Sequence, residues 1–483
     1  MYLFTDRSIF HCGRCLAGVL SVLRRFGERC SDLSEQYIPD PYVIAIVLTF
    51  VASGAALATG AGPRATLIAW TGGVWSLLPF MAAISVLLMT GDAIAKSPTF
   101  TRGLERLARL PNSRFTAVWF TSFVAMVAAV VSWAIGLIVG AIMAKRVAYE
   151  CQEKGITVHY PLLAAAGYTS LMVFHGGLSS SVGLLMADPQ LIPATFPEYV
   201  RDGIPLAQTI GSRTNTVTTG TLLVVVPVIM GLLHPEDGIR ELPRATYRDI
   251  DQVVTEAMAD STTDGGTADR SVADRLNDSR LIGLAIAVFP AFFVVNAWFL
   301  RAGGISNLTL NSINALFLLG AILLWVRPTA IVAQMKDSVT NISGIIFQFP
   351  FYAGIAGLLT GTGLATVIVE FFGAFATPAT WPVVGVLVAG VVNIFIPSGG
   401  GQWVAMGPIM LDITTGFGYG PEQAVIIEML GDQLTNMIQP FWAIPLLAIA
   451  DLRARDIIGY TTVAMLGGLV IVCGWLTVFL VLL

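Results

Sequence analysis

The chain has 483 residues, of which 55% are hydrophobic and only 12% are charged. Soluble domains usually carry about 25% charged residues, so this composition, with a mean hydropathy of +0.75, excludes a soluble globular protein. It indicates a polytopic protein whose main partner is the lipid bilayer. The net charge of −4 gives no indication of a nucleic-acid partner, and five scattered cysteines do not suggest a disulfide framework.

The N-terminal 36 residues are predicted to form a cytoplasmic tail. They carry five arginines and no long apolar core, which argues against a cleavable signal peptide. Apolar residues recur at helical spacing between Leu16 and Phe26 beside Arg24 and Arg25. This pattern predicts an amphipathic helix lying on an anionic inner leaflet.

Charge-free windows predict nine crossing helices, because a spanning helix needs about 20 apolar residues. The predicted crossings are residues 42–62, 66–92, 160–187, 210–233, 281–300, 311–326, 338–360, 422–450 and 457–483. Most of the 27 lysine and arginine residues fall in alternate loops, and such loops are cytoplasmic. This bias predicts an inner-membrane protein with the N-terminus inside and, after nine crossings, the C-terminus outside.

Two further apolar segments look like copies of each other, since Val130–Ala144 and Val391–Ala405 align at a constant offset. The first lies between basic clusters, so a hairpin that returns to the cytoplasm fits better than a crossing. We therefore predict re-entrant hairpins at 115–144 and 380–411, entering from opposite faces. Each precedes an interrupted span, at 160–187 and 422–450. The predicted fold is all-α, with inverted repeats over 37–233 and 281–483 joined by an acidic cytoplasmic linker at 234–280.

The tip of the second hairpin, Pro397–Gly401, cannot continue as a regular helix, because it contains a proline and three glycines. Exposed amides at the start of the returning helix are a ready anion site. Alternatively, the tip is a plain turn between two half-helices, and the aromatic residues near the breaks only pack instead of lining a pocket. The predicted substrate-binding residues are Ser398, Gly399, Gly400, Gly401, Gln402, Trp403, Gln439 and Trp442.

Polar groups at the remaining breaks predict a coupling-ion site for Na⁺ or H⁺. Pro440 frees the carbonyl of Asn436, and Asp432 is an intramembrane carboxylate, which is functional by default. Alternatively, Asp432 lies in a wet vestibule or pairs with a polar neighbour, and the serines bond back to their own helix. His175 is either a proton carrier or a hydrogen-bonded core residue. The predicted coupling-ion residues are Ser132, Gly176, Gly177, Ser179, Ser180, Ser181, Asn393, Asp432 and Asn436.

At these residues the chain resembles the bacterial short-chain fatty acid transporter family. The motifs that carry the resemblance are PDP at 39–41, GLIVGAIMAKRVA at 136–148, YPLL at 160–163, QFPFYAGI at 348–355, NIFIPSGGGQWV at 393–404, NMIQPFWAIPLLAIA at 436–450 and RDIIGY at 455–460. The family is similar to the wider ion transporter superfamily. That likeness implies elevator-type transport of carboxylates coupled to Na⁺ or H⁺, and by analogy a homodimer.

We therefore expect a secondary active carrier for uptake of short-chain fatty acids such as butyrate or acetoacetate. No arginine lies in a hairpin or break, which favours a monocarboxylate. The alternatives are a symporter for dicarboxylates or other organic anions, and an anion or proton channel on this fold. The spans contain no HExxH or GxSxG motif, so we expect no enzyme activity and no cofactor besides the coupling ion.

Overall fold

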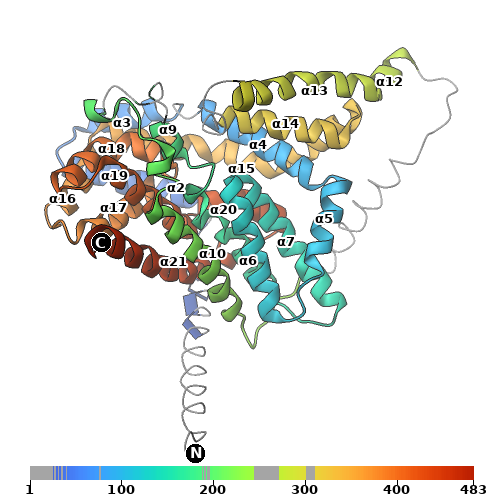
Figure 1. Cartoon of the computed structure of the whole chain (residues 1–483), viewed down its shortest axis with the longest axis horizontal. Helices are drawn as coiled ribbons and strands as arrows, with labels where there is room; N and C mark the ends of the chain where they lie inside the picture. The colour runs from blue at the N-terminus through green and yellow to red at the C-terminus, as the bar shows by residue number, and fades with distance from the viewer. Residues whose placement is uncertain are drawn as a thin grey trace, which may run out of the picture.

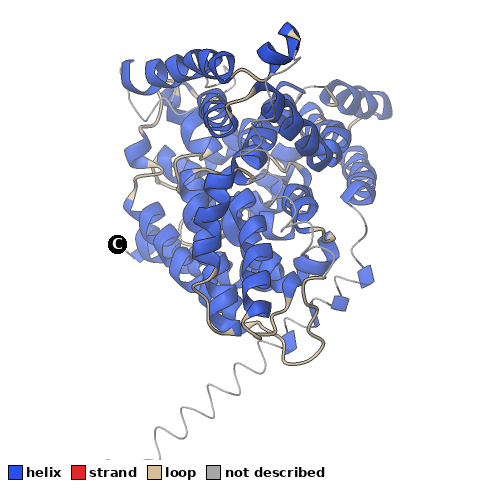
Figure 2. Cartoon of the chain, turned by 90° about the vertical axis from the view of Figure 1, so that its right-hand side faces the viewer, coloured by secondary structure: helices blue, strands red, loops and turns tan. Residues whose placement is uncertain are grey.

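The computed structural model describes residues 41–75, 78–187, 196–243, 271–300 and 310–482, with isolated residues between 25 and 39 and at 189 and 192. Secondary structure in these ranges is helical throughout, without a strand, as expected for an all-α protein (Figure 2). Most of the predicted tail at 1–36 and the centre of the predicted linker, 244–270, lie outside the described residues.

Many helices begin with proline in the first turn, where its missing N–H is not needed. In the first half the α-helices are α2 (Pro41–Ala58), α3 (Pro63–Gly73), α4 (Leu78–Ala95), α5 (Pro98–Ala108), α6 (Arg114–Val131), α7 (Trp133–Glu153), α8 (Tyr160–Tyr168), α9 (Ser181–Ala187) and α10 (Arg213–Leu232). In the second half they are α12 (Val272–Asn277), α13 (Arg280–Val295), α14 (Leu310–Trp325), α15 (Pro328–Gly361), α16 (Leu364–Gly373), α17 (Trp381–Phe395), α18 (Gly399–Gly416), α19 (Pro421–Thr435), α20 (Pro440–Ala450) and α21 (Ala454–Thr477).

Helical hairpins occupy both duplicated segments. In the first, Ser132 adopts an extended conformation (φ −155°, ψ 130°) that ends α6 and starts α7. In the second, Ile396, Pro397 and Ser398 separate α17 from α18, and the Ser398 hydroxyl accepts a hydrogen bond from the Gly401 amide at 3.3 Å. The returning helices α7 and α18 extend beyond the predicted limits of 144 and 411.

Each hairpin is followed by an interrupted helix. After α8 the chain forms short 3-10 turns, Thr169–Met172 and Phe174–Gly176, before α9 begins at Ser181. The second interruption is shorter, since a single 3-10 turn, Asn436–Ile438, and Gln439 separate α19 from α20. The first break therefore includes more residues than the pair Gly176–Gly177, which was the expected interruption.

Two predicted spans have the wrong boundaries. Residues 66–92 form two helices, α3 and α4, rather than one, because a turn follows the Gly72–Gly73 pair. Gly73 also lies directly against α15, where a Cβ would come within 2.6 Å of the Gly357 Cα atom. The span predicted at 338–360 begins ten residues earlier, at Pro328, and ends before Gly363, whose φ of +73° favours glycine.

Five helical stretches among the described residues are long and apolar enough to cross a membrane: Arg114–Val131, Tyr160–Ala187, Arg213–Leu232, Arg280–Leu300 and Ala454–Leu482. A sixth arises if α15 and α16, bent by 63°, count as one span. Nine crossings were predicted, and Arg114–Val131 was not one of them, because it lies in the predicted first hairpin. Several of the predicted crossings, including Tyr42–Ala58 and Asn311–Trp325, are shorter apolar helices. The chain is thus a multi-pass membrane protein.

The two halves of the chain interleave where the breaks occur. In Figure 1, α13 and α14 lie together at one edge, whereas α6, α7, α10 and α20 gather in the body of the molecule. Helix α20 of the second half packs against α7 of the first, and α21 packs against α8 and α10. This arrangement brings the two breaks into one buried region.

Candidate functional site

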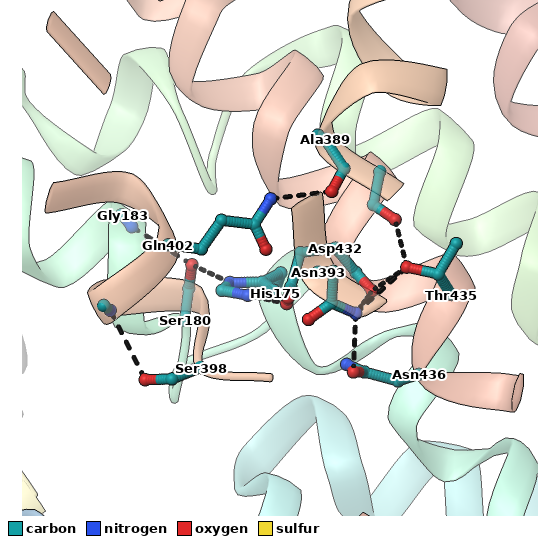
Figure 3. Close-up of polar contacts among 12 residues, drawn as sticks. His175, Ser180, Gly183, Ala389, Asn393, Ser398, Gln402, Asp432, Thr435 and Asn436 are labelled. Carbon is teal, nitrogen blue, oxygen red and sulfur yellow. Dashed lines mark hydrogen bonds and ion pairs between the residues drawn. The ribbon is translucent and has the colours of Figure 1, made fainter. Parts of the chain in front are cut away.

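A buried histidine–aspartate pair joins the two breaks. The Nε2 atom of His175, in the first break, lies 2.7 Å from the Oδ2 atom of Asp432 on α19 (Figure 3). The exposed fractions of these side chains are 0% and 1%. The Ser180 hydroxyl lies 3.0 Å from His175 Nδ1 and accepts the Gly183 amide at 3.2 Å. Ser180, a predicted ion-site residue, therefore orients the histidine ring.

The tip of the second hairpin lies against this pair. A Cβ atom at Gly399 would come within 2.5 Å of His175 Nε2 and 2.8 Å of the Ser181 hydroxyl, so only glycine fits without a shift. The first amides of a helix have no acceptor within it, and Gly399 and Gly400 begin α18. The start of α18, a type of site that can bind an anion, thus lies against an imidazole and a hydroxyl from the other half of the chain.

Asn393, at the end of α17, ties the hairpin to the second break. Its Nδ2 atom lies 3.0 Å from the Asp432 carbonyl, the Thr435 hydroxyl and the Asn436 Oδ1 atom. In return, the Gln439 amide donates to the carbonyl of Asn393 at 3.1 Å. Asn393, Asn436 and Gln439, all predicted site residues, therefore form one buried network.

A tyrosine that the sequence analysis missed satisfies the carbonyls of the second break. The Tyr168 hydroxyl, at the end of α8, lies 2.7 Å from the Asn436 carbonyl oxygen and 2.9 Å from that of Gln439. Tyr168 has no exposed surface. The carbonyl freed by Pro440 is thus bonded from the other half of the chain, and no local pattern in the sequence signals this contact.

The first hairpin tip packs on the first break in a comparable way. The Trp133 amide donates to the Ser179 hydroxyl at 2.9 Å, and the Leu178 amide donates to the Val130 carbonyl at 2.8 Å. Gly177 permits this approach, because a Cβ there would come within 2.1 Å of the Val130 oxygen. Ser179 therefore contacts the first hairpin tip in the way that Gln439 contacts the second.

A polar stripe on α10, also missed, covers the other side of the first break. A Cβ at Gly176 would come within 2.0 Å of the Thr219 hydroxyl, and the Asn215 amide donates to the Gly176 carbonyl at 3.4 Å. Both side chains are buried. The repeated threonines and asparagine at four-residue spacing in RTNTVTTG were a signal for this polar face.

Several buried polar atoms in this region lack a protein partner, although such atoms in folded proteins are usually bonded. These are Ser132 Oγ, Asn393 Oδ1, Gln402 Oε1, both Glu428 carboxylate oxygens, Asp432 Oδ1 and both polar atoms of the Gln433 amide. Among the described residues, no group of three or more His, Cys, Asp or Glu side chains could hold a metal ion. The region has unused capacity for a polar ligand or a proton.

The predicted aromatic residues have separate neighbours. Trp403 packs against Phe196 with ring centroids 6.0 Å apart, whereas Trp442 packs against Trp133 of the first hairpin at 5.3 Å. The Gln402 amide donates to the Ala389 carbonyl at 2.8 Å, within its own hairpin. Gln402 is thus held within the second hairpin, whereas Trp403 and Trp442 each contact an aromatic residue of the first half.

Comparison with known proteins identifies the family. The family model described as short chain fatty acid transporter matches residues 22–480. The chain belongs to the short-chain fatty acid transporter family. It is therefore a transport protein rather than an enzyme, and the resemblance of the PSGGG and QPFWA motifs is confirmed.

Two relatives match over nearly their whole length. A protein of Escherichia coli is 33% identical over 465 residues, which cover 95% of this chain and 100% of the relative. A protein of Haemophilus influenzae is 30% identical over 452 residues, which cover 92% and 97%. Both are provisionally named short-chain fatty acid transporters.

Two solved transporters are more distant. The YdaH transporter of Alcanivorax borkumensis has 14% identity and a TM-score of 0.46, over 90% of this chain and 98% of that one. The MtrF protein of Neisseria gonorrhoeae, described among antimetabolite efflux pumps, has 11% identity and a TM-score of 0.41, over 94% and 98%.

Proposed function

We propose that this chain takes up short-chain fatty acid anions, such as butyrate or acetoacetate, by alternating access. Membership of the short-chain fatty acid transporter family supports the substrate class. The observation that carries the proposal is the start of α18, where Gly399 lies against His175 and Ser181, and Gly400 lies beside Ser181. Such a site binds a carboxylate through main-chain dipoles.

The carboxylate would lie on the Gly399–Gly401 turn, with Ser398 fixing that turn through its bond to the Gly401 amide. The Gln439 side-chain amide donates to the Asn393 carbonyl and so fixes the end of α17 against the second break. Trp442, packed on Trp133, would contact the short alkyl tail. No lysine or arginine lies in residues 115–144, 160–187, 380–411 or 422–450, so one carboxylate per substrate is favoured over two.

The remaining polar groups would bind or gate the coupling ion. Ser132 has an unpartnered buried hydroxyl beside the Trp133–Ser179 contact, and Asn393 and Asp432 each keep one unpartnered oxygen. These oxygens lie at the tips and breaks of both halves. Binding an anion and a positive ion in the same buried region makes each favour the other, which is the basis of symport.

The two hairpins would enter from opposite faces as parts of inverted repeats. Transporters of this architecture bind substrate near the bilayer midplane at discontinuous helices, and move one bundle against the other. Here the interleaving of α7 with α20, and of α8 with α21, supports a common moving unit that contains both breaks. We propose elevator-type movement of that unit.

Uptake of labelled butyrate into proteoliposomes tests this function. Ser398→Ala removes a helix cap beside the site, and Ser113→Ala removes an equivalent cap, bonded to the Thr116 amide at 3.1 Å, outside it. We expect uptake to fall about tenfold in Ser398→Ala, as for loss of about 1.4 kcal/mol of binding, and to stay near wild type in Ser113→Ala. Equal uptake by the two variants would remove the site assignment.

A channel on the same fold is the second candidate function, because channel and carrier both need a polar midplane. Counterflow separates them, since only a carrier returns loaded with label when the opposite side holds unlabelled butyrate. We expect trans-stimulation by unlabelled butyrate. Uptake that does not respond to trans butyrate would instead indicate a channel.

A further inference from the structure

Two carboxyl groups lie one helical turn apart on α19, and among the described residues neither is bonded to a lysine or arginine. Glu428 and Asp432 are spaced i and i+4, so they share a face of the helix. Glu428 has no exposed surface, and neither of its oxygens has a partner. Asp432 has one oxygen bonded to His175 and one without a partner.

The described elements packed on α19 carry one arginine, Arg455, and no hydrogen bond or ion pair joins it to these groups. These elements are α9, α17, α18, α21 and the 3-10 turns of both breaks. Their titratable groups are His175 in the first break, Asp412 on α18, and Arg455, Asp456, Tyr460 and Cys473 on α21. Asp412 is exposed and contacts the Tyr199 hydroxyl, and Asp456 pairs with Arg240. His175 alone is bonded to the pair.

The hydrogen-bond pattern around His175 indicates which proton it donates. The Ser180 oxygen accepts the Gly183 amide, so its own hydrogen is free to point at His175 Nδ1. That assignment leaves the hydrogen on Nε2, which donates to Asp432 Oδ2. A further proton from solvent would then go to the unpartnered Asp432 oxygen or to Glu428.

A carboxylate substrate brings a third acidic group into this region, because the proposed anion site at Gly399 directly contacts His175. Buried charges without partners are strongly unfavourable. The anion is therefore bound well only when Glu428 or Asp432 has taken up a proton. Binding of substrate and of H⁺ must then increase together.

We propose that Glu428, Asp432 and His175 form a proton-binding site that makes this protein an H⁺ symporter. The inference rests on the proposed carboxylate transport and specifies its coupling ion. One proton binds to a carboxylate oxygen from the outer solution, travels with the substrate anion, and leaves to the cytoplasm when the anion leaves. Ser180 is a positioning residue, because it acts through the His175 ring.

The experiment uses the full-length protein in liposomes and separates driven uptake from exchange. Labelled butyrate uptake is measured with an inward H⁺ gradient, with an inward Na⁺ gradient, and as counterflow without either gradient. Uptake into protein-free liposomes is subtracted, because the undissociated acid crosses lipid unaided. The variants are Glu428→Gln and Asp432→Asn. Their matched controls are Glu370→Gln and Asp412→Asn, which change exposed carboxylates on α16 and α18.

We expect wild type and both controls to accumulate butyrate under the H⁺ gradient and to ignore the Na⁺ gradient. Glu428→Gln mimics the protonated group. Its H⁺-driven accumulation should fall by about tenfold or more, which corresponds to about 1.4 kcal/mol. Its counterflow should stay within about twofold of wild type, since exchange needs no net proton release. Retained counterflow also shows that the variant is folded.

Two results would overturn the inference alone: accumulation driven by Na⁺ and not by H⁺, or H⁺-driven accumulation in both variants equal to that of their controls. Absence of butyrate counterflow in the wild type would instead reject the proposed function. A His175→Gln variant adds a second readout. We expect the pH at which its H⁺-driven uptake is half-maximal to shift, whereas a merely structural role would lower uptake equally at every pH.

Discussion

The two hairpin tips arise from related sequences but are built differently. The first turns on a single residue, Ser132, and its contacts with the first break are mostly main chain. The second needs three residues, Ile396 to Ser398, and is held by side-chain amides of Asn393 and Gln439. The first tip is therefore a tight packing contact, whereas the second is an open turn fixed by a polar network.

We interpret this difference as a division of the proposed site into a supporting half and a binding half. Open amides occur where α18 starts, and unpartnered carboxyl oxygens occur on α19, both in the second half. The first half contributes His175, Ser180 and Tyr168, which bond to or orient groups of the second. The duplicated parts have thus taken different roles, and paired substitutions at matching positions test that division.

The largest expected difference lies between two glycines, Gly177 in the break that packs on the first tip, and Gly400 at the second tip. Gly177→Ala places a Cβ within 2.1 Å of the Val130 oxygen, whereas Gly400→Ala meets nothing closer than 3.8 Å. Main-chain atoms cannot rotate away, so Gly177→Ala should destabilise the protein by about 3 kcal/mol. Gly400→Ala should change stability by less than about 1 kcal/mol. Thermal unfolding of the purified proteins in detergent measures both, and equal midpoints would break the comparison.

The next difference lies between the aligned residues Asn393 and Ser132. Asn393→Ala leaves the Asp432 carbonyl and the Asn436 side chain without their buried partner, at an expected cost of about 2 kcal/mol. Ser132→Ala removes a hydroxyl that has no partner, so its effect on stability should stay within about 0.5 kcal/mol. A loss of butyrate uptake in Ser132→Ala without loss of stability would support its ion-site role.

The smallest effect concerns how the two interrupted helices begin. His159 caps α8, whereas Gly420 caps α19. His159 lies outside the span; its Nδ1 atom accepts the Arg240 amide, and its own amide donates to His234. Burial, with the positive charges of His234 and Arg240 and against the opposing effect of Asp456, lowers the pKa of His159 from 6.5 to about 4.

Between pH 6.5 and about 4, the unfolded chain binds a proton at His159 and the folded chain does not. The free energy of unfolding is therefore highest above pH 6.5 and falls as the pH drops toward 4. At pH 5.5 the loss should be about 1 kcal/mol. Unfolding midpoints at pH 7.5 and 5.5 measure this loss in wild type and in His159→Gln. The difference between the two pH values should shrink in the variant. An unchanged difference would show that His159 is not the titrating group.

The breaks were predictable because their causes are local. Proline and clustered glycines at 397–401, and Pro440, interrupt a helix wherever it lies. The turn within 66–92 was missed; it follows the Gly72–Gly73 pair, and Gly73 packs on Gly357, a residue far away in the chain. A charge-free window alone does not distinguish one long helix from two short ones.

The site was only partly predictable for a similar reason. Ser398, Asn393 and Asp432 stand out as polar residues in apolar segments. That Asp432 pairs with His175, and that Tyr168 bonds to Asn436, depends on how the two halves pack. These contacts span more than 250 residues and leave no pattern in either segment. The complete burial of Glu428 is likewise not predicted in the sequence analysis.

The most direct test of the account is the sidedness of the two tips. Single cysteines at Ser132 and Ser398, in a variant whose five native cysteines are replaced, would be labelled in oriented vesicles with an impermeant thiol reagent. The account predicts that the two sites are reached from opposite aqueous compartments, and that butyrate alters both labelling rates. Labelling of both sites from the same compartment, unaffected by butyrate, would contradict it.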